Sequence, residues 1–132
     1  MIRRRGLACL LIVVLAEMAV AGAPNLVTGS VTYRERIALV PGARVEVKLL
    51  DVSLQDVMAT ILAEQTIEVT HQVPIPFELV YDPAEIRERM SYAVSATIYQ
   101  GDKMMFTTDR HYGVLTGGQG SHVDLVLIRV SQ

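Results

Sequence analysis

Side chains that could bind a metal ion are few in this chain of 132 residues. Its histidines are His71, His111 and His122, and Asp109 and Asp124 each lie two residues from one of them. Imidazole and carboxylate groups are ligands that zinc and copper accept. His122 and Asp124 would share one face of a strand, but the set as a whole has no common local spacing. We therefore expect His71 and His122 to cap loops, His111 to be half exposed in a strand, and none of them to bind metal.

Sequence patterns that signal catalysis or phosphate binding do not occur. There is no Gly-x-Ser-x-Gly elbow, and Glu85 and Glu88 suit a solvated surface better than paired acid–base work. The glycine-rich stretch 117–120 lacks the Lys-Ser/Thr of a phosphate loop. Met104 and Met105 would face opposite sides of a strand, which favours core packing of one over a copper ligand pair. We predict a protein that is not an enzyme, with no catalytic, cofactor-binding or metal-binding residues.

The N-terminus has the composition of an export signal. A basic cluster at residues 3–5 precedes an apolar and small-residue run over 6–16. Residues 19–23 hold two overlapping small-x-small cleavage patterns, and Pro24 disfavours the second of them. We predict cleavage after Ala21.

This cleavage would divide the chain into a signal peptide over residues 1–21 and one domain over 22–132. The alternative is an uncleaved membrane anchor, but the apolar run is shorter than the ~20 residues of a spanning helix, and Glu17 interrupts it. We therefore predict a periplasmic protein. Contact with a membrane would come only through an uncleaved signal or an associated protein.

The predicted domain is mildly acidic and has no thiol. Removing three Arg and one Glu from the 12 basic and 14 acidic residues leaves 9 and 13, a net charge of −4. Such a charge argues against a nucleic-acid partner. The sole cysteine, Cys9, lies in the signal, so the domain must fold without a disulfide. Because Trp is absent and only two Phe occur, the core should be aliphatic.

Alternation of apolar and polar residues predicts strands along most of the domain. The clearest cases are residues 43–49 and 92–100, and the second runs through a Gly-Asp turn into a hairpin return over 103–108. Further strands are predicted over 26–33, 60–69 with a bulge near Glu64 and Gln65, 73–81 at a sheet edge, 111–115, and 122–130 in a central position.

Short strands in this number predict an all-β protein. About seven strands separated by turn signals, with one helical turn at residues 82–87, indicate a small antiparallel β-sandwich of the Ig-like, Greek-key type. Tyr92 stands where a tyrosine corner would, with its hydroxyl bound to the backbone of a preceding segment.

Two surfaces are candidates for contact with a partner. The proline-led edge at residues 73–81 could accept a strand, and the loop at 115–122 could bind through its exposed backbone. The alternative is that the prolines simply protect the edge and that the loop is only a linker.

Several segments resemble the YbaY/YscW-type envelope proteins, the group containing the type III secretion lipoprotein chaperone. Their order and spacing span nearly the whole domain. These segments are 27–33 (VTGSVTY), 49–53 (LLDVS), 73–77 (VPIPF), 81–83 (YDP), 92–96 (YAVSA), 106–109 (FTTD) and 123–127 (VDLVL).

The resemblance implies a β-sandwich exposed to the periplasm that acts as a binding or chaperone-like module. Its partner would be an envelope or secretion-apparatus protein, and the best-known relatives are lipoproteins that pilot a secretin. The chain departs from the lipoprotein pattern because Cys9 precedes most of the apolar run, which counts against lipid anchoring. Two alternatives stay open: a structural envelope domain without a dedicated client, and a small enzyme or metal carrier using His111, His122 and Asp124.

Overall fold

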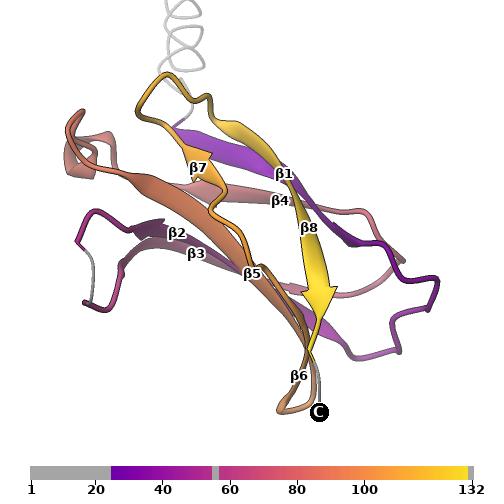
Figure 1. Cartoon of the computed structure of the whole chain (residues 1–132). Helices are drawn as coiled ribbons and strands as arrows, with labels where there is room; N and C mark the ends of the chain where they lie inside the picture. The colour runs from indigo at the N-terminus through magenta and orange to yellow at the C-terminus, as the bar shows by residue number, and fades with distance from the viewer. Residues whose placement is uncertain (1–24, 55–56, 131–132) are drawn as a thin grey trace, which may run out of the picture.

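The computed structural model describes residues 25–54 and 57–130 (Figure 1). The predicted signal peptide and Cys9 lie outside these residues. The described part contains eight strands and one short 3-10 helix. They are β1 (Leu26–Tyr33), β2 (Arg44–Asp51), β3 (Thr60–Glu68), β4 (Ile75–Val80), η2 (Pro83–Glu85), β5 (Tyr92–Gln100), β6 (Lys103–Thr107), β7 (Gly113–Val114) and β8 (His122–Arg129).

The strands form one continuous hydrogen-bonded path in the order β3-β2-β5-β6-β8-β1-β4, with β7 paired to β5. The all-β class is thus confirmed. The prediction of a wholly antiparallel fold is wrong at one place, because β1 and β8 are parallel, from Thr28 opposite His122 to Tyr33 opposite Leu127. The alternation of apolar and polar residues indicates which face of the sheet a side chain lies on. This alternation is the same for parallel and antiparallel neighbours, so it does not predict strand direction.

The predicted division into two separate sheets is not what the hydrogen bonding shows. A short pairing of β6 with β8, at Phe106 and Thr107, joins the two halves of the strand path. The sheet curves so far that its outer strands β3 and β4 approach each other, and the Glu78 N–H donates to Gln65 Oε1 at 2.8 Å. Figure 1 shows this strong curvature.

The inward faces of the strands enclose a single apolar core. The strict alternation of β1, β2 and β4 places every second residue inside. As predicted, the core is mostly aliphatic. Among its four aromatic side chains, Tyr33 stacks on Phe106 with ring centroids 4.0 Å apart, and Phe77 and Tyr92 are also buried. The largest fully buried side chains are Tyr92, Phe106, Leu49, Leu79, Ile98, Leu125, Leu127, Val27, Val31, Val45, Val47 and Val94.

Local irregularities follow the sequence closely. The bulge expected at Glu64 and Gln65 lies slightly earlier, where the register shifts opposite Leu49 and Leu50 and leaves Leu62 without a paired residue. The helical turn is confirmed as η2, capped by the Asp82 carboxylate.

The tyrosine corner is also confirmed. The Tyr92 hydroxyl accepts from the Arg87 N–H at 2.9 Å and donates to the Glu85 carbonyl at 3.3 Å. Among residues 25–54 and 57–130, no helix has the length and apolar character needed to cross a membrane.

Candidate functional site

His122 and Asp124 are brought together on the outer face of β8. Asp124 Oδ1 lies 3.3 Å from His122 Nε2 and accepts from the Ser30 hydroxyl at 2.9 Å, while Thr28 Oγ1 lies 3.0 Å from His122 Nδ1. The parallel β1–β8 register creates this row of polar contacts. The side chains of His122 and Asp124 are about two-thirds exposed, at 65% and 63%, so water solvates them. The row therefore forms a solvated part of the outer sheet face.

The other candidate ligands do not join this pair. The ring of His71 contacts the Gln72 carbonyl at 2.9 Å in an exposed loop, which fits the expected loop position. His111 lies in the connection between β6 and β7, so its expected place within a strand is wrong. Within the described part of the chain, no group of three or more His, Cys, Asp and Glu side chains is placed to hold a metal ion.

The predicted docking edge at residues 73–81 is confirmed as a sheet edge, since β4 ends the strand path. The Tyr81 N–H donates to the Asn25 carbonyl, on the side of β4 that pairs with β1. Backbone groups alternate in direction along a strand, so every second residue of β4 turns its N–H and C=O away from β1 toward the open edge. Among these, Pro76 has no N–H, and the N–H of Glu78 is taken by Gln65. At these two positions the edge therefore has no free N–H for an added strand.

The predicted contact loop at residues 115–122 is fastened to the fold. The Leu115 N–H donates to Gly120 O at 2.9 Å, and the Thr116 hydroxyl donates to Met90 O at 2.7 Å. The side chain of Gln119 covers Gly113 so closely that a Cβ there would lie 2.5 Å from its amide. The segment is therefore bonded to the rest of the fold, and the backbone groups that take part in these bonds are not free for a partner.

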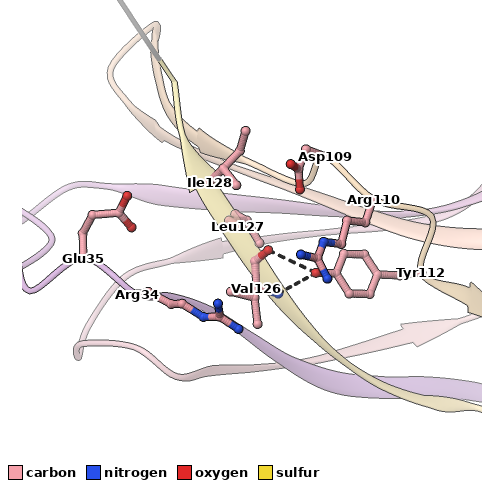
Figure 2. A pocket seen from close by; sticks show the side chains of 8 residues that line it. All are labelled: Arg34, Glu35, Asp109, Arg110, Tyr112, Val126, Leu127 and Ile128. Atoms are coloured by element: carbon pink, nitrogen blue, oxygen red, sulfur yellow. Dashed lines mark hydrogen bonds between the residues drawn. The ribbon is translucent and has the colours of Figure 1, made fainter.

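A hollow on the outer face of β8 was not predicted from the sequence (Figure 2). Its floor is formed by residues 126–128. Leu127 is buried in the core, so its neighbours Val126 and Ile128 turn outward, and Ile128 is 44% exposed. The cavity volume is about 300 Å³, enough for a few side chains of a bound segment. We call this feature the β8 hollow.

The walls of the β8 hollow come from two connections far apart in sequence. Arg34 and Glu35 follow β1, whereas Asp109, Arg110 and Tyr112 precede β7. Each wall thus carries one guanidinium and one carboxylate group. Figure 2 shows the two carboxylates toward the end of β8 and the two guanidinium groups toward its middle.

Tyr112 joins one wall to the floor. Its hydroxyl donates to the Val126 carbonyl and accepts from the Val126 N–H, both at 3.1 Å (Figure 2). These backbone groups point away from β1, in the direction where β6 pairs only with the end of β8. The Tyr112 hydroxyl therefore provides hydrogen-bond partners for backbone groups of β8 that lie beyond its short pairing with β6.

Among residues 25–54 and 57–130, the group whose pKa departs clearly from its ordinary value is Tyr33, the last residue of β1. Burial raises the pKa of the Tyr33 hydroxyl above about 10, and the nearby Glu35 carboxylate raises it further. The same hydroxyl donates to the Ile37 carbonyl at 2.7 Å. These contacts help to hold the irregular connection from which Arg34 and Glu35 reach the β8 hollow.

Sequence patterns offered little that could have indicated the β8 hollow. Residues 34–36 are polar and follow the predicted strand 26–33, whereas residues 111 and 112 fall within the strand predicted over 111–115. Their meeting depends on the β1–β8 and β6–β8 pairings, which are long-range. The weak local signal was the adjacency of opposite charges in each segment, Arg34 with Glu35 and Asp109 with Arg110.

Comparisons with known proteins find similarity over most of the chain. The family model described as "Type III secretion system lipoprotein chaperone (YscW)" matches residues 23–127. "Uncharacterized lipoprotein YbaY" of Escherichia coli (strain K12) is 36% identical over 110 residues, which cover 83% of this chain and 57% of that protein. The chain therefore spans little more than half the length of this relative.

A solved structure is also similar. It is described as an alternative pilotin from the type II secretion system of Vibrio cholerae. It is 47% identical, with a TM-score of 0.79, over 81% of this chain and 97% of that chain. At this identity the likeness extends beyond the fold. Together with the family match, it shows that the chain belongs to the family of the type III secretion system lipoprotein chaperone, YscW.

Proposed function

We propose that this protein is an exported, non-enzymatic, chaperone-like module that binds a secretion-system protein of the cell envelope, with a secretin as the partner. The observation that carries the proposal is the 47% identity to a pilotin structure over 97% of its length. The family description, a lipoprotein chaperone of type III secretion, points to the same class of role. The non-enzymatic part of the proposal is supported by the family description, which names a chaperone.

The proposal includes a division of the chain. Residues 1–21 act as a cleaved signal peptide, and residues 22–132 form the periplasmic domain, whose curved sheet packs against itself as a β-sandwich. Lipid anchoring through Cys9 is not part of the proposal, because that residue precedes most of the apolar run. Mass spectrometry of protein from native envelope separates a chain that starts near Gly22 from one that carries acyl groups.

Co-purification with a secretin from its own host tests the partner. A C-terminally tagged full chain is expressed at native level, lightly crosslinked and recovered from the envelope fraction. We expect the secretin to be enriched, and we expect deletion of the gene to reduce assembled secretin in the outer membrane. Unchanged secretin assembly together with no enrichment would exclude the proposed role.

A structural envelope domain without a dedicated client is the second candidate. The predicted export signal and the mildly acidic net charge of the β-rich domain motivate it. It predicts that deletion weakens the envelope, measured as leakage of a periplasmic enzyme, without a selective loss of one secretion system. A selective secretion defect in an intact envelope would argue against it.

A further inference from the structure

The β8 hollow presents separated positive and negative charges over an apolar floor. The guanidinium groups of Arg34 and Arg110 lie toward the middle of β8, and the carboxylates of Glu35 and Asp109 lie toward its end (Figure 2). All four residues are exposed. Such a hollow complements a ligand that carries an anionic and a cationic group a fixed distance apart.

We propose that the β8 hollow binds an extended segment of the partner protein in which an acidic and a basic side chain stand two positions apart. The acidic group lies between the two arginines, and the basic group lies between Glu35 and Asp109. This inference rests on the proposed function, because it names the kind of segment that the partner would supply.

The spacing of the floor supports an extended segment. Val126 and Ile128 are two positions apart on one strand face, and a strand advances about 3.3 Å per residue. Side chains two positions apart on a bound extended segment would be separated by about the same 7 Å and would face the hollow together. The aliphatic stems of glutamate and lysine can then lie on the valine and isoleucine floor while their charged ends reach the walls.

The charges of the walls are available to a ligand. In the part of the chain that the structure describes, Arg44 forms an ion pair with Glu46 at 3.3 Å, and the ring of His122 lies 3.3 Å from the Asp124 carboxylate. The four charged side chains of the β8 hollow take part in neither. A guanidinium group without an ion-pair partner can bind a carboxylate through two parallel hydrogen bonds, which are stronger than neutral ones.

Docking would use side chains and not an added strand. The Tyr112 hydroxyl already occupies the backbone N–H and C=O of Val126. A partner strand could pair with β8 there only by displacing this tyrosine, leaving its hydroxyl to find another partner. Side-chain recognition of charge at a fixed spacing needs no such displacement.

Binding of synthetic peptides to the purified domain tests this inference. The probe is a fluorescein-labelled, end-blocked peptide that repeats glutamate-threonine-lysine-threonine. Two comparison peptides replace every lysine by glutamate, or every glutamate by lysine. We expect the mixed peptide to bind at least about tenfold more tightly than either comparison peptide, measured by fluorescence anisotropy. Equal affinity for all three peptides, or no binding of the mixed one, would overturn the inference.

A charge-reversal variant locates the binding. Replacing Arg34→Glu and Arg110→Glu together makes all four wall charges negative. We expect affinity for the mixed peptide to fall about tenfold and affinity for the all-lysine peptide to rise. The control is Arg89→Glu paired with Lys103→Glu, which makes the same change in total charge at exposed residues outside the hollow. Equal loss in the control would overturn the assignment to the hollow. The melting temperatures of all variants verify that they fold.

The inference and the proposed function can fail separately. If the Arg34 and Arg110 double variant still co-purifies the secretin at wild-type yield, the β8 hollow is not the binding site, and the proposed function stands. If the wild-type protein discriminates the peptides but recovers no secretin, the identity of the partner is wrong.

Discussion

At the scale of single residues, the hydroxyls of Tyr92 and Tyr112 each bond to both a backbone N–H and a backbone C=O group. Tyr92 ties the segment around η2 to the start of β5, and Tyr112 ties the approach to β7 to the middle of β8. Each hydroxyl is both donor and acceptor, so a single side chain satisfies an N–H and a C=O group. Such bonds are useful in this sheet because it curves so strongly that neighbouring strands cannot pair with every backbone group.

Removing the Tyr92 hydroxyl should destabilise the domain. Tyr92 is 1% exposed, and Tyr92→Phe leaves the Arg87 N–H and the Glu85 C=O without this partner. We expect a loss of about 1–2 kcal/mol in the free energy of unfolding, measured by urea denaturation.

The matched control for this substitution is Tyr99→Phe. The Tyr99 ring lies 4.5 Å from the Arg44 guanidinium carbon and is kept in the variant. We expect a change within about 0.5 kcal/mol. Equal effects of the two substitutions would contradict the role assigned to the tyrosine corner.

The raised pKa of Tyr33 predicts a loss of stability in alkaline solution. In the unfolded chain this tyrosine ionises near pH 10, whereas burial and Glu35 hold the proton on the folded protein to higher pH. The folded state then binds more protons, so the free energy of unfolding falls as pH rises above about 10 and is unaffected by this group below that. Urea midpoints between about pH 8 and pH 11 measure the effect.

The variant Tyr33→Phe isolates this group. It loses the bond to the Ile37 carbonyl, so its stability should be lower at neutral pH. Its decline above about pH 10 should, however, be shallower than that of the wild type. A decline of identical slope in both proteins would show that Tyr33 does not contribute.

At the scale of elements, the parallel pairing of β1 with β8 requires a close approach of two backbones. A Cβ at Gly29 would lie 1.6 Å from the carbonyl oxygen of Val123, closer than any contact can be. We expect Gly29→Ala to force the strands apart and to cost about 3 kcal/mol of stability or more. The melting temperature of the purified variant measures this cost.

The chain offers a glycine control for this effect. Gly120 lies in the loop before β8, and a Cβ there would meet nothing within 4 Å. We expect Gly120→Ala to change stability by less than about 0.5 kcal/mol. If both variants melted alike, the tight β1–β8 approach would not be a feature of the protein in solution.

At the scale of the whole molecule, β8 holds the two halves of the strand path together. It lies between β6 and β1, and its Leu125 and Leu127 are 0% and 2% exposed. We expect a chain truncated after Ser121 to lose cooperative unfolding, because it lacks a strand within the sheet and part of the core. Near-UV and far-UV circular dichroism through a thermal ramp measure this.

The control is a chain truncated after Val130, which keeps all of β8 and the bond from the Val130 N–H to Met105. It should unfold cooperatively near the wild-type temperature. A sharp transition in the shorter chain would show that β8 is dispensable.

The sequence alone determined the strands and the class of the fold. Val45, Val47 and Leu49 alternate with charged residues, and this alternation decides which face is buried whatever the neighbouring strands are. The turn after β5, the proline-marked edge at β4 and the corner at Tyr92 likewise depend on residues close together in the chain. They could therefore be predicted.

The tertiary structure decided strand direction, sheet closure and the candidate site. Thr28 and His122 are 94 positions apart, and the closing contact of Gln65 with Glu78 joins opposite edges of the sheet. The β8 hollow is assembled from three such distant segments. The sequence pattern around a residue predicts whether it is buried. It does not predict which strand lies beside it, because side-chain alternation is the same for a parallel and an antiparallel neighbour.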